Sequence, residues 1–135
     1  MPIVAVPLED EVGDVLDKAM SWVGLSIDQV AVMADISTSR IHDAIDYRGD
    51  LTGTELGRLA RVLHLNEVGL CALGEQSYPL PACQGLPFSV HALRMPHGVG
   101  VANAYIVSEP DSNRGILFDT GPNLAALLLN WPEAI

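Results

Sequence analysis

Basic side chains are scarce in this sequence. Its 135 residues include seven Lys and Arg against seventeen Asp and Glu, which gives a net charge of −10. Nonspecific affinity for nucleic acid comes from basic side chains that displace counterions from phosphates. This composition therefore argues against a protein that binds nucleic acid through its overall charge.

Long apolar runs and leader signals are also missing. No run of 18 apolar residues occurs, and no basic segment followed by an apolar one begins the chain, so we expect neither a membrane span nor a signal peptide. The two cysteines, Cys71 and Cys83, lie twelve positions apart, whereas metal-binding pairs usually lie about two to four apart. We therefore expect two reduced thiols in a cytoplasmic protein without membrane partners.

The first half of the sequence has the pattern of a helical bundle. Acidic residues followed by helical apolar spacing predict a helix over residues 9–23, and Gly24 ends it. Ser26 and Gln29 form a capping box, in which each side chain satisfies a backbone N–H of the other residue. A second helix is therefore expected to begin after Ser26.

Three more helices follow by the same signals. Ser37 is a suitable N-cap for a third helix, and Gly49 is expected to end it. Thr52 and Glu55 form a second capping box before an apolar stripe that consists of Leu56, Leu59, Ala60 and Leu63. Asn66 can cap a short fifth helix that extends through residue 73.

This succession of helix, tight turn, small polar helix and leucine-striped helix resembles the XRE/lambda-repressor-like helix-turn-helix domain. The resemblance implies a five-helix module over residues 1–75, with a recognition helix whose first residues reach base edges in the major groove. The candidate DNA-binding residues are Thr38, Ser39, Arg40 and Asp43. One departure is Ile27, which stands where the family usually has a glutamine that contacts phosphate.

Electrostatics leave the role of this module open. Residues 1–75 contain thirteen acidic and five basic side chains, a net charge of −8. In and beside the recognition helix, Asp43 and Asp46 offset the two arginines. DNA binding therefore competes with a module that docks a protein partner or forms a homodimer, and a solvated helix face is the plain alternative for Arg40 and His42.

The sequence changes character after the helices. Prolines and glycines over residues 76–87 predict a linker. The expected elements beyond it are strands over 88–95, 99–107 and 115–119, a turn at 96–98, and a helix over 122–131. We therefore expect an α+β protein with helices in its first half and a small sheet in its second.

This second half resembles the opening of the metallo-β-lactamase fold. Asn103 and Tyr105 form an Asn-x-Tyr strand, and an apolar strand then ends in Asp119-Thr120-Gly121 before a helix. The resemblance covers residues 88–135 and implies that Asp119 supports a metal site without being one of its ligands. It also implies that the chain is the N-terminal part, or a truncated relative, of a metal-dependent hydrolase with a helix-turn-helix accessory module.

In that family the metal ligands come from a His-x-His-x-Asp-His motif after the first helix, and this sequence has no such motif. Its four histidines are His42, His64, His91 and His97, and no pair has a His-x-His or helical i, i+4 spacing. We therefore expect no competent metal site and no catalysis from these 135 residues, with zinc or another divalent metal only in a full-length product.

Other interpretations of these motifs remain. An aspartic protease also uses Asp-Thr-Gly, but it needs tens of further residues to build its flap and sheet, and only fourteen follow Gly121. Alternatively, Asp119 simply caps the helix that follows, which is compatible with the metallo-β-lactamase resemblance. The alternative function is a helix-turn-helix DNA-binding regulator, or a protein-docking module, with a vestigial C-terminal tail.

Overall fold

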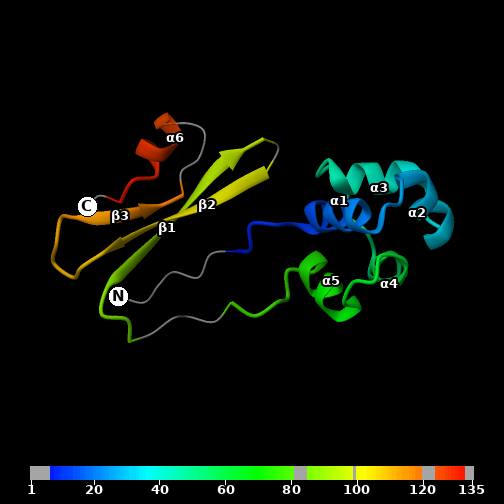
Figure 1. Ribbon diagram of the computed structural model, residues 1–135, viewed down its shortest axis with the longest axis horizontal. Coiled ribbons are helices and arrows are strands. Elements are labelled where there is room, and N and C mark those ends of the chain that lie inside the picture. Colours follow the sequence, from blue (N-terminus) through cyan, green and yellow to red (C-terminus); the bar gives the residue numbers. More distant parts are fainter. Residues whose placement is uncertain (1–6, 81–84, 99, 120–123, 133–135) are drawn as a thin grey trace. The chain divides into compact units, whose positions relative to one another are not determined.

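The computed structural model describes residues 7–80, 85–98, 100–119 and 124–132 (Figure 1). Over these ranges the chain is α+β, with six helices and one three-stranded antiparallel sheet, which confirms the expected fold class. It divides into two compact units. The helical unit is Asp10–Pro79, and the sheet unit combines Met1–Glu9 with Leu80–Ile135.

The helical unit contains five helices, as the sequence predicts. They are α1 (Val12–Val23), α2 (Ile27–Ala34), α3 (Thr38–Ile45), α4 (Gly53–Val62) and α5 (Glu67–Gly74). Both predicted capping boxes are present, since Ser26 Oγ accepts from the Gln29 N–H at 3.2 Å and Thr52 Oγ1 accepts from the Glu55 N–H at 3.3 Å. The helix starts are therefore encoded locally.

The prediction that Gly49 ends the third helix is wrong. Helix α3 already ends at Ile45, and Tyr47 then adopts a left-handed backbone with φ 59°. The Arg48 N–H donates to the Asp43 carbonyl at 2.7 Å, which closes the last turn. Ser37 is the N-cap residue of α3 by position, but its side chain accepts no capping hydrogen bond.

One apolar core holds the helical unit together. Helix α2 packs against α3 and α4, while α1 packs against α3 and α5. The fully buried side chains at its centre are Leu16, Val30, Ile41, Leu56 and Leu59. Helices α1 and α3 approach closely at Gly13, where an added Cβ would lie 2.9 Å from the Ile45 Cα.

The sheet unit is an antiparallel meander with the order β1-β2-β3 (Figure 1). Its elements are β1 (Ser89–His97), β2 (Gly100–Ser108), β3 (Gly115–Phe118) and helix α6 (Leu124–Leu129). The turn expected at 96–98 is shorter than predicted, because Pro96 and His97 belong to β1 and pair with Val101 and Gly100. The predicted helix start at Pro122 lies outside the described residues.

The two faces of this sheet differ. One face buries Leu93, Met95, Ala104 and Ile106, against which Leu127 of α6 packs. The pairing of Tyr105 with Phe118 places both side chains on the opposite face, and Phe118 is 53% exposed there. Strand β3 is an edge strand and pairs only with residues 105–108 of β2.

The N-terminal segment Pro7–Glu9 belongs to the sheet unit. The Pro7 carbonyl accepts from Arg94 Nη1 at 3.1 Å and from Asn103 Nδ2 at 3.2 Å. The Asn103 backbone N–H, beyond the end of the β2–β3 ladder, donates to the Glu9 carboxylate at 3.0 Å. This segment therefore satisfies part of the β2 edge that β3 does not reach.

Candidate functional site

Helices α2 and α3 are joined by a tight turn. Asp35, which follows α2, has a left-handed backbone with φ 52°. The Ile36 N–H donates to the Ala31 carbonyl at 3.0 Å, the hydrogen bond typical of a Schellman helix end. Ile36 is buried, so its side chain anchors the turn to the core, and Ser37 starts the next helix.

The four candidate DNA-binding residues lie together in and around the first turns of α3. Thr38 and Asp43 are half-buried, whereas Ser39 and Arg40 are exposed. Thr38 Oγ1 donates to the Asp28 carboxylate at 3.3 Å, so this hydroxyl already has a partner inside the unit. The four residues therefore lie on one short helix, but most of their polar groups bind other residues of the helical unit.

Arg40 shows this most clearly. Its Nε and Nη2 donate to the two carboxylate oxygens of Glu55 at 2.6 and 2.7 Å, and Nη2 also donates to the Asp50 carbonyl at 3.0 Å. The hydrogen bond from Arg40 is the main reason that the pKa of Glu55 falls to about 2. The same pair raises the pKa of Arg40. The guanidinium group of Arg40 is therefore hydrogen-bonded to Glu55 of α4 in a bidentate manner.

Arg48 also forms ion pairs within the helical unit. Its Nη2 lies 3.1 Å from the Asp43 carboxylate and 3.0 Å from that of Asp46. The other ion pairs of the helical unit are Lys18–Asp10, Arg58–Asp35 and Arg61–Glu67. All five basic side chains of residues 10–79 thus face acids of the same unit, which contains twelve Asp and Glu. The unit has a net charge of −7, because its twelve acids outnumber its five bases.

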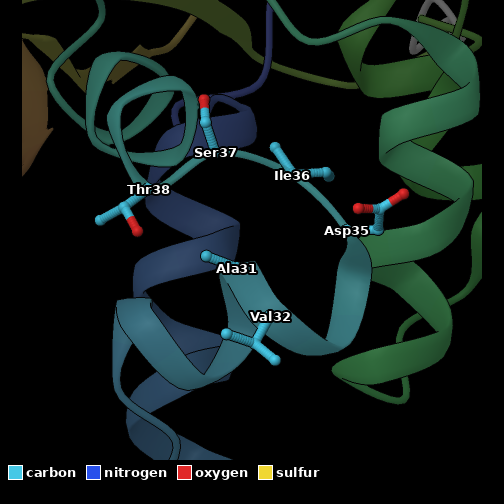
Figure 2. Close-up of a pocket in the computed structure, with 6 residues that line it drawn as sticks. All are labelled: Ala31, Val32, Asp35, Ile36, Ser37 and Thr38. Carbon is cyan, nitrogen blue, oxygen red and sulfur yellow. The ribbon is translucent and has the colours of Figure 1, made fainter.

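A hollow opens beside the helix-turn-helix turn and has a volume of about 480 Å³. The residues that line it come from the end of α2, the turn and the start of α3, and they are Ala31, Val32, Asp35, Ile36, Ser37 and Thr38 (Figure 2). The Val32 side chain is 83% exposed, and the Asp35 carboxylate is almost fully exposed although Arg58 contacts it. The hollow therefore combines apolar surface with negative charge.

The candidate metal-supporting residue Asp119 follows directly after β3. Tyr105 pairs with Phe118 at the end of the β2–β3 ladder, and Asp119 then turns the chain with a left-handed φ of 61°. Asn and Asp tolerate this backbone region better than most residues. The neighbouring Thr120 and Gly121 of the Asp-Thr-Gly motif lie outside the described residues.

Within the described ranges, no three His, Cys, Asp or Glu side chains come together in a way that would hold a metal ion. His91 and His97 lie on the same strand, β1, six residues and therefore about 20 Å apart, so they do not converge across the hairpin. Cys71 is a free thiol, and Cys83 lies outside the described residues. The residues described here do not make up the ligand set of a metallo-β-lactamase site.

Two important residues escaped the sequence analysis. Glu55 was recognised as part of a capping box, but not as the partner of Arg40, which lies fifteen positions away on α3. Asn103 was recognised as part of Asn-x-Tyr, yet its contact with Pro7 joins positions 96 residues apart. Neither contact has a signal in local spacing, because both are made across the tertiary fold.

Among the described residues, no helix combines the length and the apolar character needed to cross a membrane. Comparison with known proteins finds no match to this chain, whether among protein families, curated proteins or solved structures.

Proposed function

We propose that residues 88–135 are the N-terminal part of a metallo-β-lactamase-fold hydrolase domain, or of a truncated relative, and that the helical unit is its accessory module. The observation that carries this proposal is the position of Asp119. An antiparallel hairpin is followed by a short strand that ends at this aspartate, which has a left-handed backbone before the next helix. Such backbone positions are common at functional sites.

In this proposal Asp119 orients a metal site whose ligands are not among the described residues. The activity therefore belongs to a protein that also contains a His-x-His-x-Asp-His segment, with zinc or another divalent metal. The 135 residues supply the opening of the sheet and the supporting carboxylate, and they do not hydrolyse a substrate by themselves.

A matched pair of variants tests the role of Asp119. In the protein as its native host makes it, Asp119→Asn should lower the metal content and the hydrolytic activity together. Asp111→Asn is the control, because Asp111 is also exposed and also has a left-handed φ of 61°. Asn tolerates this backbone region, so both variants should fold. Equal metal content in both variants would contradict the proposal.

For the helical unit, the ion pairs favour protein docking over DNA binding. A DNA-reading helix needs free guanidinium or amide groups for base edges and phosphates. Arg40 and Arg48 instead satisfy Glu55, Asp43 and Asp46. With every basic side chain of the unit paired and a net charge of −7, the unit repels a phosphate backbone. A homodimer remains one form of such docking.

A salt titration with labelled duplex DNA tests this preference. We expect no binding of the chain even at low ionic strength, where contacts with phosphate are strongest. Arg40→Ala should then leave the result unchanged. Measurable binding at low salt that weakens steeply with added salt, and that Arg40→Ala removes, would establish the DNA-binding alternative instead.

A further inference from the structure

We propose that the hollow beside the helix-turn-helix turn docks a basic amphipathic helical segment of a partner protein. This inference rests on the docking role proposed above and names the chemistry of the partner. The proposed docking surface, the α2 face, consists of Val32, Asp35 and Thr38 together with Asp28.

The apolar part of the α2 face is centred on an exposed valine. Val32 lines the hollow and is 83% exposed. Ala31 and Ile36 are nearly buried and contribute to the lining of the hollow. An apolar side chain of a partner can therefore contact Val32 and enter the hollow without displacing any core residue.

The charged part of the α2 face favours a partner segment of positive charge. Asp28 lies one helical turn before Val32 on the same side of α2, and Thr38, which lines the hollow, donates to it. Asp35 lies three residues after Val32. Arg58 contacts one oxygen of its carboxylate at 3.3 Å, but the side chain is still 97% exposed. Charge complementarity thus favours a segment with Lys or Arg on both sides of an apolar anchor, and it disfavours an acidic segment or nucleic acid.

The spacing of these groups fits a helical partner. Asp35, just after the end of α2, follows Asp28 by seven positions, which corresponds to about 10 Å along the helix axis. Basic side chains at positions i and i+7 of a second helix, with an apolar one at i+4, span the same length. We therefore infer a partner segment with the pattern basic, apolar, basic over two helical turns.

The test uses the full chain and two fluorescein-labelled peptides, followed by fluorescence anisotropy. One is a helical Lys/Leu peptide with this pattern, and the other has Glu in place of each Lys. Val32→Lys should weaken binding of the Lys/Leu peptide by about tenfold or more. Val68→Lys is the matched control, because Val68 is 80% exposed on α5, another eight-residue helix, and does not line the hollow. Both variants change the net charge equally.

A second pair isolates the charge contribution. Asp28→Asn should weaken binding of the Lys/Leu peptide and flatten its salt dependence, whereas Asp17→Asn, at an exposed position of α1, should do neither. If the Glu/Leu peptide binds better and Val32→Lys strengthens its binding, docking at this face stands and the basic partner is wrong. If the Lys/Leu peptide binds equally to the Val32→Lys and Val68→Lys variants, the α2 face is not the site. Direct binding of labelled duplex DNA to the chain at low salt would overturn the docking role itself.

Discussion

Arg40 and Glu55 join α3 to α4 through two parallel hydrogen bonds of 2.6 and 2.7 Å. The Arg40 side chain is 45% exposed, whereas that of Glu55 is only 14% exposed, so the carboxylate is the more buried partner of the pair. Its geometry is the bidentate arrangement in which an arginine contributes most. The same contact engages the guanidinium group that a DNA-reading role would need.

Acid pH should release this contact. The pKa of Glu55 is lowered to about 2 in the folded chain from its ordinary value of 4.5, so the carboxylate stabilises the fold above pH 4.5. This stabilisation is lost as the pH falls from about 4.5 toward 2. The midpoint temperature of unfolding, followed by circular dichroism between pH 7 and pH 2, should therefore fall in this window.

Glu55→Gln separates the charge from the helix cap, because glutamine also serves at this position of a capping box. The variant should unfold at a lower temperature than the wild type at pH 7, and the difference should shrink toward pH 2. A constant difference between the two proteins at all pH values would show that the charge of Glu55 does not contribute.

The Tyr47 hydroxyl, which donates to the Asp14 carboxylate, should contribute to the packing of α1 against the end of α3. Burial and this hydrogen bond both raise the pKa of Tyr47, so the hydroxyl stays protonated at any pH at which the protein is handled. Tyr47→Phe should lower the free energy of unfolding by about 1–2 kcal/mol, as measured by urea denaturation. No loss of stability would mean that water replaces the hydroxyl.

Gly13 should be intolerant of any side chain. A Cβ at this position would lie 2.9 Å from the Ile45 Cα and closer still to the Ala44 carbonyl oxygen, and both are backbone atoms that cannot turn aside. Gly13→Ala should therefore destabilise the helical unit by about 1–3 kcal/mol. The control is Gly53→Ala, at the start of α4 with no atom within 4 Å of an added Cβ, which should stabilise by about 0.5 kcal/mol. Equal effects of the two variants in urea denaturation would contradict the close approach of α1 and α3.

Asn103 should hold the N-terminal segment on the sheet. Its side chain is 7% exposed and donates to the Pro7 carbonyl, while its own Oδ1 has no hydrogen-bond partner among the described residues. Asn103→Ala removes that donor but also an unsatisfied acceptor, so the expected loss of stability is only about 1 kcal/mol. Hydrogen exchange should nevertheless become faster at the Asn103 backbone amide, because the Glu9 carboxylate that it contacts is no longer held.

The exposed Asn113 provides the control for Asn103. Asn113→Ala should change the free energy of unfolding by less than about 0.5 kcal/mol and leave exchange in β2 unaffected. Unchanged exchange at position 103 in the Asn103→Ala variant would show that Pro7–Glu9 is held by other contacts.

The sequence was sufficient for the parts of the fold that are specified locally. Capping boxes at Ser26 and Thr52 located two helix starts, because each box involves residues only three positions apart. The end of α3 was misplaced, because the chain already leaves the helix before Tyr47, which has a left-handed backbone. The Tyr47 hydroxyl contacts Asp14 on another helix, and local spacing gives no signal for this contact. The three strands were found within a few residues of their ends.

The candidate site was only partly predictable. Spacing placed Thr38, Ser39, Arg40 and Asp43 on one helix, and the acidic composition raised the doubt about DNA binding. Which carboxylate neutralises Arg40 was not predictable, because Asp43 is its neighbour in sequence whereas Glu55 is its partner in space. The N-terminal contact of Asn103 likewise required the folded sheet.

The most direct test of the proposed function is the intact mass of the protein as its native host produces it, measured together with the sequence of any residues beyond these 135. The proposal predicts a mass well above the 14.4 kDa of this chain, with a His-x-His-x-Asp-His segment in the additional residues and bound divalent metal. A mass of 14.4 kDa, with no such segment, would contradict a hydrolase and leave the docking module as the functional part of the chain.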